Sequence, residues 1–150
     1  MLGAPFDPQI RTVHVPIFTT ESDRRGYEFL LTEAVQKEIQ DRSHFRLADA
    51  HTADTRLVGR IVNIRKDVLG ETAFDDPREL QLSLFVEVTW EDLRDGRILA
   101  QHRMALPSEI VQLTSTAEFA PEVGQSLATA SQQAVNRMSR QIVNMMETPW

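Results

Sequence analysis

The chain has 150 residues, of which 41% are hydrophobic, and this is enough to fill the core of one domain. Its formal net charge of -6 gives no general attraction to nucleic acid or anionic lipid, so an anion site would have to be a local cluster. The sequence contains no cysteine, which excludes disulfides, thiolate metal sites and cysteine catalysis within it.

An extended arm is expected over residues 1–10, because glycine and proline recur there. Residues 11–150 are expected to form a single domain. Its first strand is predicted where Val13, Val15 and Ile17 alternate with other residues. It is expected to end near Phe18, and Pro16, which cannot donate to a ladder, suggests an edge position or a strand end.

An amphipathic helix is predicted over residues 24–41. Tyr27, Leu30, Leu31 and Ala34 recur at the spacing that places side chains on one face of a helix. This helix should therefore cover part of the core.

Two long strands are predicted in the middle of the chain. The first covers residues 56–69, and its alternation slips near Gly59, which indicates a bulge or the close approach of another backbone. The second covers residues 80–90, where every even position is large and apolar, so one face is buried and the other is wet. The Asp-Gly turn at residues 92–96 then leads into a further predicted strand over residues 98–106.

The end of the chain combines a loop with a long helix. Residues 114–124 are polar and are predicted as a loop, whereas apolar residues recur every three or four positions over residues 125–147. The order of strand, helix, three strands and helix indicates an α+β two-layer sandwich. We expect a four-stranded, mostly antiparallel sheet with two helices packed on one face.

No catalytic constellation is recognisable. The histidines lack metal-ligand spacing, and neither a G-x-S-x-G turn nor a glycine-rich phosphate loop is present. Adjacent carboxylates occur at Asp75 and Asp76 and at Glu91 and Asp92. Carboxylates that flank turns usually accept nearby backbone N–H groups, so we interpret them as turn stabilisers. We expect a protein that is not an enzyme and has no metal or cofactor.

Basic residues provide a candidate binding site. Arg60, Arg65 and Lys66 are predicted on one strand, and Arg103 lies on the predicted strand after the turn. Neighbouring strands that brought them together would create a cationic patch able to hold phosphates or carboxylates. The alternative is a solvated strand face that discourages edge-to-edge aggregation.

Five segments occur in an order that is typical of one family. They read V-H-V-P-I-F at residues 13–18, R-G-Y-E-F-L-L-T-E-A at residues 25–34, A-D-T-R-L-V-G at residues 53–59, W-E-D-L-R-D-G at residues 90–96, and an A-x-x-x-A helix ending in I-V-x-x-M within residues 128–147. In order and spacing, this set resembles the LptE family of lipopolysaccharide-assembly lipoproteins.

The resemblance implies a periplasm-facing lipoprotein of the outer membrane that partners and plugs an LptD-type β-barrel and helps lipopolysaccharide to reach the cell surface. It also implies two helices on a four-stranded sheet. In the family an acylated cysteine just before the arm is the anchor, and we expect Met1 to stand in place of a removed signal and anchor. Lipopolysaccharide phosphates favour basic ligands, which would be Arg60, Arg65, Lys66 and Arg103.

Two other hypotheses belong to different classes. The chain could be a periplasmic binding or adaptor module for another envelope ligand or protein, because one fold can carry unrelated sites. A hydrolase that uses the acidic pairs is a weaker alternative, since no acid/base constellation supports it. Partner contact is expected on the wet face of the strand at residues 80–90, around Gln81, Ser83, Phe85 and Glu87.

Overall fold

The chain is described here from a computed structural model. The described residues are 10–71, 77–96, 98–99, 112–119 and 127–147. For residues 66–71, 77–81, 112–119 and 127 the description is limited to the backbone.

The described strands form one mixed, six-stranded sheet. They are β1 (Thr12–His14), β2 (Thr19–Thr20), β3 (Arg46–Leu47), β4 (Thr55–Glu71), β5 (Pro77–Asp92) and β6 (Gln112–Phe119). The order is β3-β1-β4-β5-β6, and β2 also pairs with β4. The long strands β4, β5 and β6 pair antiparallel, whereas β1 pairs parallel with β3 and β4, and β2 pairs parallel with β4.

The predicted α+β class is confirmed, but the prediction of four mostly antiparallel strands is wrong. The described residues form six strands, and three of the pairings between them are parallel. Parallel neighbours need a crossover connection. Helix α1 (Tyr27–Arg42) provides it, since this helix lies between β2 and β3 in the chain.

Strand β6 replaces a predicted loop. Residues 114–124 were expected to be a loop, yet residues 112–119 pair with β5 from Glu87↔Gln112 to Leu80↔Phe119. Ser115 and Ala117 are level with Leu84 and Leu82 of β5, so small residues stand where a search for apolar alternation looks for large ones. Of the strand predicted at residues 98–106, Ile98 forms one bridge with Glu91, and residues 100–106 lie outside the described part.

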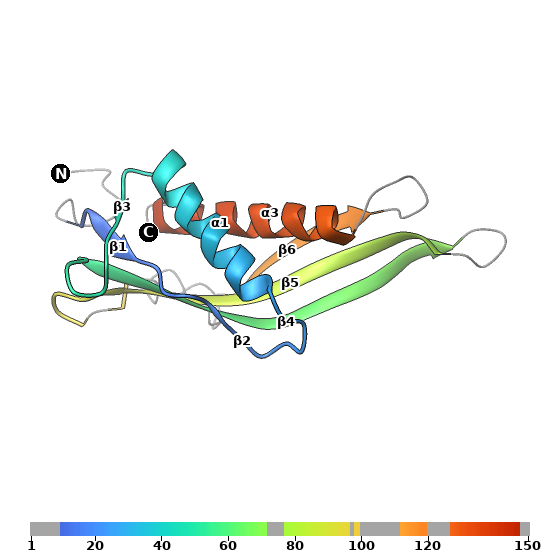
Figure 1. The fold of residues 1–150 in the computed structure, drawn as a ribbon, viewed down its shortest axis with the longest axis horizontal. Coiled ribbons are helices and arrows are strands. Elements are labelled where there is room, and N and C mark those ends of the chain that lie inside the picture. The colour runs from blue at the N-terminus through green and yellow to red at the C-terminus, as the bar shows by residue number, and fades with distance from the viewer. Residues whose placement is uncertain (1–9, 72–76, 97, 100–111, 120–126, 148–150) are drawn as a thin grey trace.

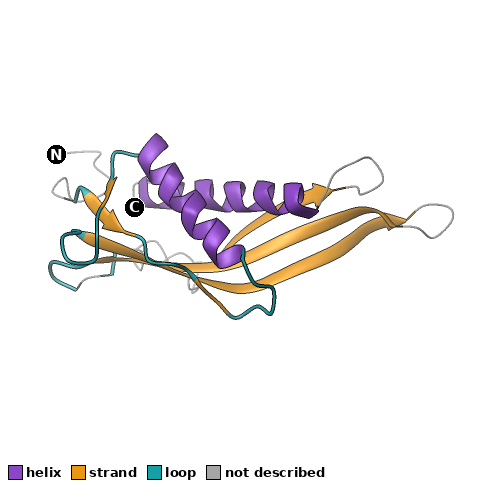
Figure 2. Ribbon diagram, viewed as in Figure 1, coloured by secondary structure: helices purple, strands orange, loops and turns teal. Residues whose placement is uncertain are grey.

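Two helices cover the same face of the sheet, as Figures 1 and 2 show. The even positions of β5 from residue 82 to residue 90 are all buried beneath them, as predicted. Helix α3 (Leu127–Glu147) faces this layer with a row of buried residues, namely Ala130, Ala134, Met138, Ile142 and Met145. A hydrogen bond of 2.5 Å between Tyr27 Oη and Ser131 Oγ joins the two helices.

Helix α1 begins at Tyr27, three residues later than predicted. Gly26 precedes it with a φ of 104°, which is a left-handed conformation that glycine adopts without strain. The Glu28 carboxylate accepts the N–H of Gly26 at 2.9 Å and so satisfies the helix entry. Leu31 is fully buried as predicted, but Leu30 remains 39% exposed.

The first predicted strand is interrupted. Val13 and Val15 are buried, whereas Ile17 is 59% exposed and Phe18 is buried in its place. Phe18 N–H donates to Thr32 Oγ1 of helix α1 at 2.9 Å, so the chain leaves the sheet between β1 and β2 to follow the helix. Because the strand is interrupted here, the side-chain alternation of β1 does not continue through Ile17 and Phe18.

Strand β4 contains a bulge at Val62. Ile61 pairs with Val86, but Asn63 pairs with Phe85, so one residue of β4 has no counterpart in β5. An extra residue reverses the alternation of side chains. Ile61 and Ile64 are consequently both buried, although three positions separate them.

Asp54, just before β4, ties three segments together. Its Oδ2 accepts the N–H groups of Arg11 at 2.9 Å and Thr12 at 3.2 Å, and its own N–H donates to Thr12 Oγ1 at 2.8 Å. Its carbonyl accepts the N–H of Leu93 at 2.9 Å. The bond from Arg11 N–H is the main reason why the pKa of the Asp54 carboxyl lies below its usual value.

Candidate functional site

The face of the sheet opposite the two helices is the candidate site. No described helix lies over it (Figure 2). Strand β4 contributes Arg56, Val58 and Arg60 before the bulge, and Arg65 after it. Because the bulge reverses the alternation, Arg60 and Arg65 lie on the same face despite their odd separation.

Arg60 is held between two carboxylates. Its Nη1 lies 2.9 Å from Glu21 Oε1, and its Nη2 binds the carboxylate of Glu87 on β5. Hydrogen bonding to Glu87 and the negative charges of both partners raise the Arg60 pKa above its usual value. Arg60 is therefore a cation that already has two anionic partners, and a phosphate would have to replace one of them.

Arg56 forms a second ion pair on the same face. Its Nε and Nη2 lie 2.7 Å and 2.6 Å from Glu91 Oε1 of β5. Since Arg56 is 43% exposed, this pair contributes little to stability but fixes the pattern of charge on the face.

Arg65 lies beside an aromatic ring. Its guanidinium carbon is 5.3 Å from the centroid of the Phe85 ring, which is within cation–π range. The Arg65 side chain is exposed, and the Phe85 side chain is partly buried. This contact places a cationic group beside an aromatic ring on the uncovered face.

The other two predicted ligands cannot be placed as side chains. Lys66 pairs with Leu82 in the backbone ladder, while its side chain lies outside the description. Arg103 lies outside the described residues altogether. The structure thus brings Arg60 and Arg65 to one face, and the grouping of all four residues stays a prediction.

The acidic residues near the turn are structural, as predicted for Asp92. This carboxylate is buried and accepts the N–H of Arg94 at 2.9 Å, along with Arg94 Nε at 3.0 Å and Nη2 at 2.8 Å. Glu91 differs from the prediction, because it pairs with Arg56 across the strands. Asp75 and Asp76 lie outside the described residues.

A pocket of about 420 Å³ borders this face. Residues 21–24 form one wall and residues 62–64 of β4 form the other. It opens where the chain leaves the sheet after β2, next to the bulge at Val62.

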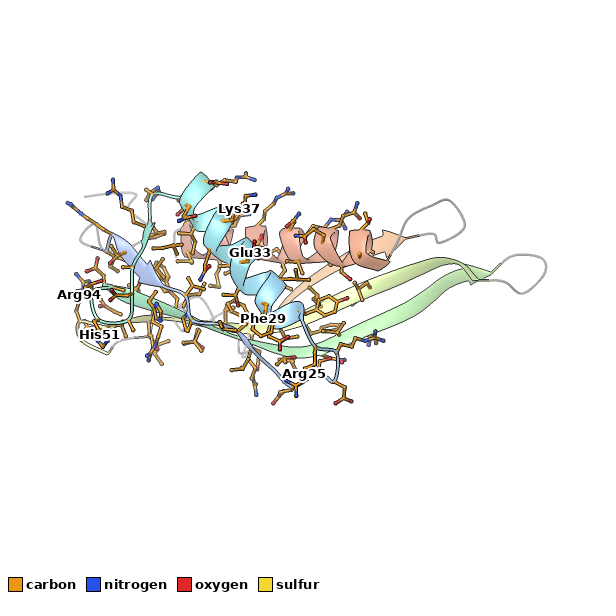
Figure 3. The ribbon with its side chains drawn as sticks, viewed as in Figure 1. Arg25, Phe29, Glu33, Lys37, His51 and Arg94 are labelled. Carbon is orange, nitrogen blue, oxygen red and sulfur yellow. The ribbon has the colours of Figure 1, made fainter. Side chains whose placement is uncertain are left out.

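An exposed apolar pair lies on the helical side of the molecule. Ile17 and Phe29 are 59% and 58% exposed. Figure 3 shows Phe29, Glu33 and Lys37 in a row along α1, and all three are exposed. The two apolar residues come from neighbouring segments, because Gln36 Nε2 of α1 donates to the carbonyl of Val15 at 3.1 Å.

The described ranges contain neither a metal-binding cluster nor a helix that could span a membrane. No group of three or more histidine and acidic residues there is arranged to hold a metal ion. Neither described helix is long and apolar enough to cross a bilayer. Met138, Met145 and Met146 are buried, so these methionines fill the core.

Sequence reasoning missed the carboxylates that surround the predicted cations. Glu87 and Glu91 were available as a signal, because both were predicted on the wet face of the strand next to Arg56 and Arg60. Glu21 gave no such signal. Its position depends on the parallel pairing of β2 with β4, which links residues about 40 positions apart in the sequence.

Comparison with known proteins adds a family match and fold relatives. The model of the LptE family, described as lipopolysaccharide-assembly, matches residues 10–148. No curated protein matches the sequence.

Three solved structures of bacterial proteins resemble the fold. A hypothetical protein from Chlamydia trachomatis has a TM-score of 0.61 at 13% identity, over 91% of this chain and 95% of its own. A protein from Xanthomonas campestris has a TM-score of 0.60 at 12% identity, over 94% and 88%. A minor lipoprotein from Acinetobacter baumannii has a TM-score of 0.57 at 15% identity, over 92% and 93%. At these identities the likeness concerns the fold alone.

Proposed function

Because this chain belongs to the LptE family of lipopolysaccharide-assembly proteins, we propose that it is a non-catalytic component of lipopolysaccharide assembly at the periplasmic face of the outer membrane. In this proposal a lipid anchor precedes one domain, and the domain plugs an LptD-type β-barrel and supports the assembly of that barrel. The family match over residues 10–148 carries the proposal.

The uncovered face of the sheet supports the barrel-facing role. The lumen of a transmembrane β-barrel is polar, so a protein that fills it needs a polar surface. Arg56 and Arg60 with their carboxylate partners provide one, and such exposed pairs can exchange partners with a charged wall at small cost.

Lipopolysaccharide binding is a second part of the proposal. Its phosphates would be bound by Arg60, Arg65, Lys66 and Arg103. The contact with the Phe85 ring would hold the Arg65 guanidinium at the surface of this face, where a phosphate could reach it. Arg60 would contribute by exchanging Glu21 or Glu87 for a phosphate oxygen.

The alternative is a periplasmic adaptor for another envelope ligand or protein. Ile17 and Phe29, which come from neighbouring segments and are both more than half exposed, would be its contact residues.

Co-purification tests the main proposal against this alternative. The chain with its native anchor, and the LptD-type barrel of the same organism, would be expressed together and extracted in detergent. We expect to recover the barrel in a stoichiometric complex with the chain. When the chain is depleted, the amount of correctly folded barrel should fall. Recovery of the chain without any barrel, and unchanged barrel folding, would contradict the main proposal and favour the adaptor.

A titration tests the lipopolysaccharide ligands separately. Lipopolysaccharide would be added to the wild type, to a triple variant with Arg60, Arg65 and Lys66 changed to alanine, and to Arg56→Ala. The last is a matched control, since it removes an ion-paired arginine from the same strand and face. We expect weaker binding in the triple variant alone, and equal affinity in all three proteins would exclude these ligands.

A further inference from the structure

Over the described part of the chain, strand β4 has an open edge beyond Ile61. Strand β2 covers this edge at Thr19↔Arg60 and Thr20↔Ile61. The last hydrogen bond on this side runs from Glu21 N–H to the carbonyl of Ile61 at 2.9 Å, after which the chain turns toward α1. Strand β4 continues to Glu71 with β5 on its other side, and no other described strand pairs with this stretch (Figure 1).

Some residues of this open stretch direct their backbone N–H and C=O groups away from β5. Ile61 directs its carbonyl to the β2 side, as its bond with Glu21 shows. Along a strand, the side-chain face and the direction of the N–H and C=O groups alternate together. The bulge makes Ile64 the next residue buried on the face of Ile61, so the backbone groups of Ile64 face the open edge. The same alternation assigns the backbone of Lys66 to this edge.

The pocket of about 420 Å³ lies at the start of this edge. One wall is β4 itself at residues 62–64, and the other is the segment 21–24 that leaves the sheet. Ser22 Oγ accepts the N–H of Arg24 at 3.0 Å, which gives that wall a defined shape. An extended chain in the pocket would continue the line of β2 along β4.

We propose that this edge binds an extended segment of a partner protein, which adds a strand to the sheet by pairing with the backbone of Ile64 and Lys66. A polypeptide is the ligand whose donors and acceptors repeat at the spacing of a strand. An acyl chain has neither group. The inference is independent of the proposed role in lipopolysaccharide assembly.

The geometry favours a single foreign strand over a second copy of this chain. Residues 21–24 line the pocket together with residues 62–64 at the start of the edge, and one extended segment would meet only these residues and the edge itself. The β4 edge of another copy would arrive with its own residues 21–24 and with β5 attached. Asp23 and Arg24 on the wall are both exposed, and a basic side chain of the partner segment would pair with Asp23.

Amide exchange in the full chain tests the proposal. The probe is a capped peptide that alternates threonine and valine and contains one lysine, added at millimolar concentration to the isotope-labelled protein. We expect the amides of Ile64 and Lys66 to exchange severalfold more slowly, with chemical-shift changes centred on residues 21–24 and 62–66. No change at millimolar peptide would overturn the proposal.

Two N-methylated peptides provide the sharpest control. Methyl groups on the amides that face β4 remove the pairing donors, whereas methyl groups on the alternate amides leave them intact. Binding should be lost for one register of methylation and kept for the other. Equal binding of both peptides would show that the main chain is not what is recognised, and would reject the added strand.

Variants and protein concentration distinguish a peptide at this edge from a second copy of the chain and from a lipid. Asp23→Lys should weaken the lysine-containing peptide severalfold, whereas Thr89→Lys on the uncovered face should leave its affinity unchanged. If both variants bind it as the wild type does, the assigned wall is wrong. Protection of Ile64 that rises with protein concentration alone would identify a second copy instead, and protection by lipopolysaccharide micelles but not by peptide would identify a lipid ligand.

Discussion

The ring of Phe18 lies directly against the backbone of Gly59. A Cβ atom placed on Gly59 would stand 2.2 Å from Phe18 Cε2 and 2.4 Å from two other ring atoms. Phe18 is buried, and its N–H is bound to Thr32, so the ring has little room to move away. The close approach predicted at Gly59 therefore comes from a side chain, and not from another backbone.

Gly59→Ala should destabilise the protein by about 1–3 kcal/mol, because the added methyl group overpacks the contact with Phe18. The free energy of unfolding from urea denaturation would measure the loss. Val58→Ala, at the exposed neighbouring position, is the control and should change stability by less than about 0.5 kcal/mol.

A double variant identifies the cause of that loss. Phe18→Leu removes the ring, so it should reduce the additional cost of Gly59→Ala. Additive losses in the two single variants would mean that the ring is not responsible.

The hydrogen bond between Tyr27 and Ser131 should contribute to the docking of α1 on α3. Tyr27→Phe keeps the ring and removes the hydroxyl, and we expect a loss of about 0.5–1.5 kcal/mol. The double-mutant cycle with Ser131→Ala, followed by thermal unfolding, isolates the interaction. A coupling energy of zero would show that each hydroxyl acts alone.

Asp54 should make the protein sensitive to acid. Its pKa lies below the usual 3.8 in the folded chain, chiefly because Arg11 N–H donates to the charged form. Its stabilising contribution is therefore fully present above the pKa of the unfolded chain. That contribution is lost as pH falls through the lower pKa of the folded chain.

Asp54→Asn should accordingly be less stable than the wild type at neutral pH, and this difference should shrink as pH falls below about 4. Denaturation midpoints across the acid range would show the effect. Asp49→Asn is the comparison variant. The Asp49 carboxylate is exposed, and its pKa is also lowered, chiefly because the N–H of His51 donates to it. A constant difference between Asp54→Asn and wild type at all pH values would remove Asp54 from the acid response.

Glu87→Gln should strengthen lipopolysaccharide binding if Arg60 is one of the ligands. The substitution removes one of two carboxylates from Arg60, so a phosphate would no longer compete with that charge. We expect a severalfold gain in affinity that fades at high salt, because these groups are exposed.

Glu91→Gln is the matched control for this gain. It releases Arg56, which is not among the proposed ligands, in the same way and on the same two strands. An equal gain in both variants would point to the general loss of negative charge, and would remove Arg60 as a specific ligand.

Much of the fold follows from local patterns in the sequence. The buried even positions of β5 and the row of buried residues on α3 are set by period-two and helical spacing, so they were predicted correctly. The parallel strands were not, because pairing β1 with β3 and β4 depends on contacts that α1 creates between distant segments. The first strand was predicted to continue to Phe18 on alternation alone, which the bond between Phe18 and Thr32 overrides.

The candidate site was predictable only in part for the same reason. Arg60 and Arg65 were identified by residue type, and their common face depends on a bulge whose position the sequence did not reveal. The alternation of the sequence slips near Gly59, three positions before the bulge at Val62. Glu21 reaches Arg60 only after β2 has docked on β4.

The bulge also has a consequence for how β4 can diverge. A relative that lost the residue at Val62 would keep the inner and outer positions of residues 55–61 and exchange those of residues 64 and 65. Its counterpart of Ile64 would then face water, and that of Arg65 would face the helices. Hydrophobic and charged positions beyond the bulge must therefore change together with this single residue, while the part of the strand before it is free to vary independently.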